Sequence, residues 1–148
     1  MTRYDPTESL GFLVNRAARL MAAELSRRLE VHGVAIGQWA VLFFLYQRDG
    51  LSQAELSREV AIEPPTVVRT VERMVRDGLV ERRSDPHDAR LVRVYLTEKS
   101  RGLQDQLVAE SQAVNAMATA ALGDESAELL RAQLRVLIAA LTTSGPNR

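Results

Sequence analysis

The spacing of hydrophobic and polar residues changes several times along this chain, and each change marks an expected element. Near the start, apolar residues recur at steps of three and four, which predicts an amphipathic helix ending near His32 and Gly33. A second helix follows Ile36, and because it is apolar nearly all round from Trp39 to Tyr46 we expect it to be buried. The apolar residues of the first helix are Leu13, Ala17, Leu20, Met21, Leu25 and Leu29.

Two short helices are expected next, separated by a turn at residues 61–63. Ser52 and Glu55 have the spacing of a capping box, so the first of these helices begins there. Pro64 and Pro65 suit the first turn of the second helix, and Gly78 suits its end, where a left-handed residue is favoured. The expected buried face of this second helix is Val67, Val68, Val71, Met74 and Val75, and its open face is Thr66, Arg69, Thr70, Arg73 and Arg76.

A β-hairpin follows these helices. Residues 79–83 and 91–96 are short runs of β type, the second with alternating side chains. Residues 84–90, Ser-Asp-Pro-His-Asp-Ala-Arg, are rich in turn formers and make a loop longer than a tight hairpin turn, so this loop should project as a wing. Any two packed amphipathic helices can imitate a helix-turn-helix, but the hairpin that follows favours a winged helix-turn-helix.

Two long helices complete the expected secondary structure. Thr97 is expected to cap a helix that runs to about Leu122, and Asp124 to cap another after Gly123. The second of these carries Leu130, Leu134, Leu137, Ile138 and Leu141 on one side. These apolar faces are more than the winged motif needs for its own core, so they suit packing between two chains.

The expected fold class is mainly α with a small β-hairpin wing. We expect a single domain over residues 1–148, with a winged helix-turn-helix DNA-binding region at 35–97 and dimerisation helices at 1–34 and 98–143. A two-fold homodimer would present two recognition helices to successive major grooves, which matches a palindromic site in double-stranded DNA.

Composition narrows the possible functions. With 148 residues, 46% hydrophobic and 26% charged, the chain can bury a sizeable core. Its formal net charge is zero, so indiscriminate coating of nucleic acid is not expected. It has no cysteine, which excludes disulfides and thiol-based sensing. No apolar run approaches the roughly 20 residues of a membrane span and the start lacks a signal peptide's apolar core, so we expect a cytoplasmic protein with no membrane partner.

The residue types of the open helix face and the wing suit DNA reading. Arginine can bond guanine with two hydrogen bonds and threonine can touch a thymine methyl or a phosphate, which favours Thr66, Arg69, Thr70 and Arg73 as DNA contacts. Arg90 at the wing tip suits the negative minor groove, with Asp88 as a buttress. The alternatives are an ordinary solvated helix face, paired with Glu72 and Asp77, and a simple solvated turn.

The chain resembles the multiple antibiotic resistance regulators, the MarR family. The resemblance is strongest from Gly78 to Ser100, where Gly-Leu-Val-Glu-Arg-Arg-Ser-Asp-Pro-His-Asp-Ala-Arg and Val-Tyr-Leu-Thr-Glu-Lys-Ser look like that family's wing signature. It implies a dimeric repressor or activator whose recognition helix enters the major groove and whose wing arginine enters the minor groove. Two departures are Glu63-Pro64-Pro65, where small polar residues are more usual, and Ser100, where glycine is common and serine should be harmless.

A regulator needs an input, and the resemblance implies a small aromatic or anionic effector. Such ligands bind, in this family, where the dimer helices meet the winged region, so Arg16, His32, Trp39 and Phe43 are the candidate contacts. The alternatives are that the aromatic residues belong to the core, that Arg16 is solvated or paired across a dimer, and that His32 simply ends a helix.

Catalysis is not expected. His32 and His87 lie in different segments, no residues have metal-ligand spacing, and no phosphate loop or nucleophile elbow occurs, so we expect no enzyme activity, no cofactor and no metal. The expected function is a sequence-specific DNA-binding transcriptional regulator, a homodimeric repressor released from its operator by the effector. The alternative is a dimeric winged-helix interaction module without specific DNA binding.

Overall fold

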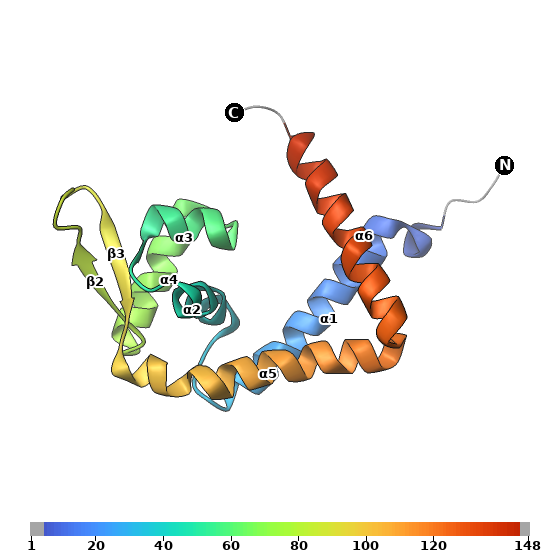
Figure 1. Cartoon of the computed structure of the whole chain (residues 1–148), viewed down its shortest axis with the longest axis horizontal. Coiled ribbons are helices and arrows are strands. Elements are labelled where there is room, and N and C mark those ends of the chain that lie inside the picture. Colours follow the sequence, from blue (N-terminus) through green and yellow to red (C-terminus); the bar gives the residue numbers. More distant parts are fainter. Residues whose placement is uncertain (1–4, 146–148) are drawn as a thin grey trace. The chain divides into compact units, whose positions relative to one another are not determined.

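The computed structural model describes residues 5–145 (Figure 1). Backbone contacts divide the chain into two compact units, one ending at Glu110 and the other beginning at Ser111, which are described separately. The first unit contains η1 (Pro6–Glu8), α1 (Leu10–Glu30), α2 (Ile36–Gln47), β1 (Leu51–Ser52), α3 (Gln53–Val60), α4 (Pro64–Arg76), β2 (Val80–Ser84), β3 (Val92–Leu96) and the start of α5 (Glu98–Leu122). The second contains the rest of α5 and α6 (Asp124–Thr143). The expected helices and hairpin are therefore present, with strand limits shifted by one residue.

The sheet has three strands in the order β1-β3-β2, all antiparallel. The sequence analysis predicted only the hairpin of β2 and β3, and it did not predict a strand before the helix that Ser52 begins. Leu51 pairs with Val94, and Ser52 pairs with Arg93. A two-residue strand has no alternation to reveal it, so only the pairing partner makes it a strand. Through β1 the hairpin is tied directly to the start of α3.

The turn between α3 and α4 forms largely as expected. The Ser52 hydroxyl accepts a hydrogen bond from the Glu55 N–H at 3.1 Å, which caps α3. Ala61 ends this helix in the left-handed conformation, with φ 57°, a position more often held by glycine. Pro64 and Pro65 occupy the first turn of α4. These two helices and the turn place α4 beside β2, and the hairpin loop projects away from the helices (Figure 1).

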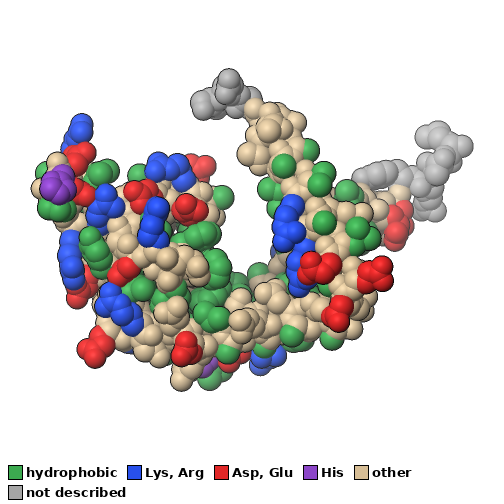
Figure 2. Space-filling view, viewed as in Figure 1, with side chains coloured by type: hydrophobic (Ala, Val, Ile, Leu, Met, Phe, Trp, Pro, Cys, Tyr) green, Lys and Arg blue, Asp and Glu red, His purple; other side chains and the backbone are tan. Residues whose placement is uncertain are grey.

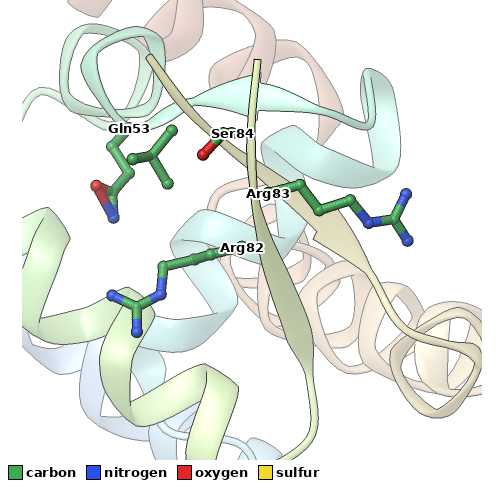
Figure 3. Close-up of a pocket in the computed structure, with 5 residues that line it drawn as sticks. Gln53, Arg82, Arg83 and Ser84 are labelled. Atoms are coloured by element: carbon green, nitrogen blue, oxygen red, sulfur yellow. The ribbon is translucent and has the colours of Figure 1, made fainter. Parts of the chain in front are cut away.

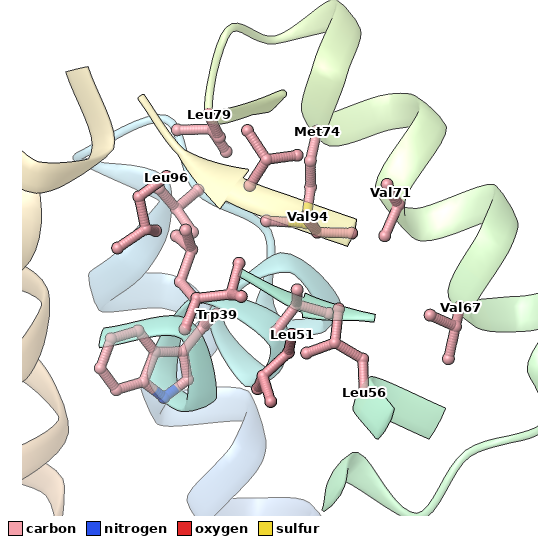
Figure 4. Close-up of a cluster of buried hydrophobic side chains, with 14 of the residues drawn as sticks. Trp39, Leu51, Leu56, Val67, Val71, Met74, Leu79, Val94 and Leu96 are labelled. Atoms are coloured by element: carbon pink, nitrogen blue, oxygen red, sulfur yellow. The ribbon is translucent and has the colours of Figure 1, made fainter. Parts of the chain in front are cut away.

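The core lies between α2, α3, α4 and the sheet, and Figure 4 shows their apolar side chains meeting there. Two predictions about its membership were wrong. Val68 and Val75 were expected on the buried face of α4, but they are 37% and 36% exposed, whereas Val67, Val71 and Met74 are fully buried. The apolar stripe of α4 is therefore narrower than predicted, because three positions at steps of four and three already fill the space beneath this helix. Phe43, expected within the buried second helix, is 42% exposed.

The start of α5 depends on Ser100, which the sequence analysis considered harmless. Ser100 is fully buried, and its hydroxyl accepts a hydrogen bond from Thr97 N at 3.1 Å. The Thr97 hydroxyl in turn accepts from Ser100 N at 3.3 Å, so the two residues cap each other. Tyr46 of α2 also donates to the Ser100 carbonyl at 2.5 Å. Ser100 is thus a structural residue that joins α2 to α5.

In the second unit, Gly123 separates α5 from α6 with a positive φ of 86°. Gly123 itself is the residue that caps α6, and Asp124 is its first helical residue, so the prediction that Asp124 caps this helix was wrong. An aspartate in the first turn still favours the helix electrostatically. The Arg131 side chain pairs with Glu128 and donates to the Thr119 hydroxyl at 3.3 Å, which joins α6 to the end of α5.

Candidate nucleic-acid interface

The exposed face of α4 gathers three of the predicted DNA contacts. At about 100° per residue, Thr66, Arg69 and Arg73 fall within roughly 60° of one another, on the side away from the buried valines. All three are exposed, and Arg69 Nη2 donates to Thr66 Oγ1 at 3.3 Å. Thr70 lies at the margin of this face and is half-buried. The face therefore offers two guanidinium groups and a hydroxyl to an external partner.

The first turn of α4 offers side chains rather than free N–H groups. Pro64 and Pro65 have no N–H, and the N–H groups of Thr66 and Val67 both donate to the Glu63 carbonyl, at 3.0 and 3.2 Å. A helix start usually presents several unpaired donors that can bind a phosphate. Here those donors are missing or used, so binding through this turn would depend on side chains such as Thr66.

The wing loop is organised by Asp85, which the sequence analysis did not single out. One carboxylate oxygen of Asp85 accepts from the N–H groups of His87 and Asp88, at 2.8 and 2.9 Å. The other accepts from Arg93 Nε at 2.5 Å. The Arg93 guanidinium beside it and the His87 N–H lower the pKa of Asp85 to about 2. The sequence signal for this role was an aspartate followed by proline, which commonly begins a turn.

Arg90 is held at the wing tip by Asp88, as the buttress hypothesis predicted. Arg90 Nε and Nη2 donate to the two carboxylate oxygens of Asp88, at 3.1 and 3.2 Å. The guanidinium of Arg90 lowers the pKa of Asp88, as does the Arg90 N–H. The Arg90 side chain is nevertheless 90% exposed. Asp88 therefore orients the arginine and leaves it open to a partner.

A shallow pocket next to the hairpin brings together Gln53 and Arg82, two polar side chains that the sequence analysis did not single out. It is lined by Gln53, Arg82, Arg83, Ser84 and Val92. In Figure 3, Arg82 extends from β2 on the same side as Gln53, and Arg83 extends on the opposite side of the strand. Gln53 Nε2 is buried and has no hydrogen-bond partner. Successive side chains of a strand point to opposite faces, so the opposite directions of Arg82 and Arg83 were predictable from sequence. That Gln53 lies near Arg82 depends on the fold.

Arginines and acids are interleaved over the winged region, as Figure 2 shows. Arg83 pairs with Glu81 at 2.9 Å and lies over the Tyr95 ring, with its guanidinium carbon 4.6 Å from the ring centroid. Within residues 5–145, in contrast, no acidic side chain pairs with Arg69, Arg73 or Arg82. These three arginines can therefore contact a partner without breaking an internal ion pair. Arg76 has a long contact of 3.9 Å to Asp77, in line with a solvated helix end.

His32 lies just after α1 and contacts an acid on α5. His32 Nε2 is 3.2 Å from Glu110 Oε1, and Arg28 Nη1 donates to the other oxygen of Glu110 at 3.3 Å. The hydrogen bonds with these two side chains lower the pKa of Glu110, and the one with His32 has the larger effect. His32 is therefore part of a polar contact that ties the end of α1 to α5.

Of the other candidate effector contacts, Trp39 and Phe43 lie together on α2, whereas Arg16 lies far from His32 along α1. Trp39 is only 7% exposed and belongs to the core, and the ring of Phe43 meets its edge at a centroid distance of 5.7 Å. Arg16 lies on an exposed part of α1, about 21 Å along the helix axis from its last residue, Glu30. The structure thus brings Trp39 and Phe43 together, but one chain does not bring Arg16 to His32.

Residues 5–145 contain neither a cluster of metal-ligating side chains nor a membrane-spanning helix. No three His, Cys, Asp or Glu side chains are grouped so that they could hold a metal ion. No helix in that range is long and apolar enough to cross a membrane.

The helix, turn, helix and wing, with an exposed arginine-bearing face on the second helix, define a winged helix-turn-helix protein. A sequence model described as MarR family matches residues 32–91, the stretch from the end of α1 to the end of the wing loop. The chain has the winged helix-turn-helix fold, and residues 32–91 are similar to the MarR family, which the wing sequence also resembles.

Individual proteins are similar to this chain in sequence or in fold. The chain is 36% identical over 87 residues to the uncharacterized HTH-type transcriptional regulator YwoH of Bacillus subtilis (strain 168), a match that covers 59% of this chain and 63% of YwoH, less than two thirds of its length. A MarR transcriptional regulator from Methanosarcina mazei Go1 superposes with a TM-score of 0.83 at 25% identity, covering 90% of this chain and 96% of that one. MepR of S. aureus, in a complex with DNA, shares the fold with a TM-score of 0.82 at 22% identity, over 90% and 98% of the two chains.

Proposed function

We propose that this protein is a sequence-specific DNA-binding transcriptional regulator. The observation that carries the proposal is Arg90, whose guanidinium is held by two hydrogen bonds to Asp88 while 90% of the side chain is exposed. An arginine fixed at the tip of a hairpin suits insertion into a narrow minor groove. Thr66, Arg69, Thr70 and Arg73 would then contact the major groove from α4. MepR, which shares this fold, was solved with DNA, and YwoH is named as a transcriptional regulator.

The proposed regulator acts as a homodimer on a palindromic site. Segments 1–34 and 98–143 would supply the dimerisation helices. Within α1, Leu10 and Leu20 are 66% and 59% exposed, and within α6, Val136 and Leu141 are 71% and 64% exposed. Apolar side chains repeated along helices in this way are typical of surfaces that another chain covers. Two copies would place two α4 helices about one DNA turn apart.

Repression that a small aromatic or anionic effector relieves is the finer part of the proposal. Phe43 is 42% exposed and lies against Trp39, so an aromatic ligand could stack there. Arg16 is too far along α1 to serve the same ligand as His32 within one protomer, and it would contribute only from the second copy. His32 contacts Glu110, and the negative charge of this carboxylate would oppose the binding of an anionic ligand beside His32.

The test begins with selection of binding sites. Purified protein recovers duplexes from a random-sequence pool, and its affinity for the recovered duplex and a scrambled duplex is measured over a range of salt, with the mass of the complex. A palindromic consensus bound by two copies, with preference over scrambled DNA, supports the proposal. If the selection yields no consensus, or if the protein binds the recovered and scrambled duplexes equally weakly, the winged-helix interaction module is favoured instead.

The wing contact is tested with Arg90→Ala. Loss of the wing arginine should weaken binding to the recovered duplex about tenfold or more and leave the dimer folded. Arg135→Ala, which removes an equal charge from an exposed position on α6, is the matched control and should leave the affinity unchanged. If the two variants bind equally well, Arg90 is not a DNA contact.

A further inference from the structure

The C-terminal end of α4 is held by side chains from two other helices. Lys99 Nζ, on α5, donates to the Asp77 carbonyl at 2.8 Å, and the Thr97 hydroxyl donates to the Gly78 carbonyl at 2.7 Å. Gln38 Nε2, on α2, donates to the Asp77 carboxylate at 2.8 Å. By contrast, the residue that precedes α4, Glu63, makes no side-chain cap. The end of the helix far from its first turn is therefore the anchored one.

These contacts complete a helix end that the backbone closes only in part. Gly78, with φ +73°, donates to the Val75 carbonyl at 3.1 Å, and Leu79 donates to the Met74 carbonyl at 2.8 Å, which is the pattern of a Schellman motif. Among the described residues, no backbone N–H donates to the carbonyls of Asp77 and Gly78, the two residues that follow the helix. Lys99 and Thr97 supply the two missing donors, and the ammonium group also suits the negative end of the helix.

These hydrogen bonds are directional, so they can fix the orientation of α4 in a way that the apolar core does not. Val67, Val71 and Met74 fix the depth of α4, but apolar contact is non-directional and tolerates sliding and rotation of the helix. Hydrogen bonds require defined distances and angles. The donors of Thr97, Lys99 of α5 and Gln38 of α2 bind the two residues that end α4, Asp77 and Gly78, and therefore set the rotation of α4 and its position along its own axis.

Small changes at the anchored end become large ones at the DNA-facing end. The 13 residues of α4 span about 20 Å, so a tilt of about 10° about the C-terminal end would move its first turn by about 3 Å. Base-edge hydrogen bonds must be held to within about 0.5 Å. Thr66 and Arg69 lie in the half of the helix that would move most.

We propose that Lys99, with Thr97 and Gln38, is a positioning residue that aims α4 at the bases without touching DNA. This inference rests on the proposed function, because it concerns how accurately α4 reads a sequence. Lys99 is best suited to a test, since it is exposed and its Nζ contact lies outside the core. Its stem also lies near Gly78, with Cδ 3.9 Å from where a Cβ on that glycine would be.

The experiment compares Lys99→Met, which removes the donor and keeps the side-chain length, with Lys99→Arg, which keeps a charged donor. Arg135→Met controls for the loss of one positive charge. Because α6 is a proposed dimerisation helix, the mass of each variant in solution is measured as well, and it should equal that of the wild type. Each full-length protein is measured on the duplex selected by the wild type and on a scrambled duplex, over a range of salt. Hydrogen exchange of peptides covering residues 64–79 is followed in the free proteins.

Lys99→Met should weaken binding to the selected duplex about three- to tenfold, leave binding to the scrambled duplex and the salt slope unchanged, and speed exchange in α4. Lys99→Arg should restore affinity, and Arg135→Met should match the wild type. A parallel loss on both duplexes with a smaller salt slope would show that Lys99 contacts phosphate and would overturn the proposal. Unchanged exchange in Lys99→Met would also overturn it, independently of DNA. Failure of the wild type to prefer any duplex would instead reject the proposed function, and with it the reading role of Lys99.

Discussion

Substitution of Gly50 by alanine should destabilise the protein through two separable effects. Gly50 has φ +75°, a conformation that costs a residue with a Cβ about 1–2 kcal/mol. A Cβ at this position would also lie 2.8 Å from Tyr95 Cε1, closer than carbon atoms approach one another. Overfilling a packed site typically costs about 1–3 kcal/mol, so the total should be about 2–5 kcal/mol.

Gly33 provides the matched control, because its φ is +73° and nothing lies within 4 Å of its would-be Cβ. Gly33→Ala should therefore cost only the backbone strain, about 1–2 kcal/mol. For a chain of this size each kcal/mol corresponds to about 2–4 °C in Tm, so Gly50→Ala should lower Tm by roughly 5–15 °C, and Gly33→Ala by less. Thermal unfolding followed by circular dichroism measures both.

A double-mutant cycle with Tyr95→Ala isolates the steric contribution. Without the ring, Gly50→Ala should cost no more than Gly33→Ala, which gives a coupling energy of about 1–3 kcal/mol between positions 50 and 95. Equal losses for Gly50→Ala in the presence and absence of the ring would refute this explanation. The contact matters to the wing because the Gly50 carbonyl accepts a hydrogen bond from Arg93 at 3.0 Å.

Three further outcomes are expected. The pKa of Asp85 is lowered from its ordinary value of 3.8 to about 2. Its ion pair therefore stabilises the folded state fully above pH 3.8, and this stabilisation is lost as the pH falls toward 2. Asp85→Asn should make acid unfolding less steep in that range. Ser100→Ala removes the hydrogen bonds between the Ser100 hydroxyl and Thr97 and should cost about 1–2 kcal/mol in urea unfolding, whereas no loss would show that the cap is dispensable. Val67→Ala should cost about 2 kcal/mol and Val68→Ala less than about 1 kcal/mol, because the two side chains are 0% and 37% exposed; equal losses would contradict this reasoning.

Sequence patterns predicted most of the secondary structure because the relevant signals are local. Ser52 caps α3, Pro64 and Pro65 begin α4, and Gly78 ends it with a positive φ, as their backbone preferences require. The hydrogen bonds from Arg90 to Asp88 were also foreseeable, since the two residues are separated by only one position in a turn. Such interactions depend on neighbours along the chain, which the sequence displays directly.

The sequence alone therefore determined the order of the helices and the wing, and roughly where most of them begin and end. Only the tertiary structure decided that Leu51 forms a strand with Val94, that Val68 faces solvent, and that Lys99 holds the end of α4. In each case the partner is distant in sequence or the available space is shared among several elements. Helical or β periodicity reports a preference of one segment, whereas burial and long-range hydrogen bonds depend on which segments compete for the same place.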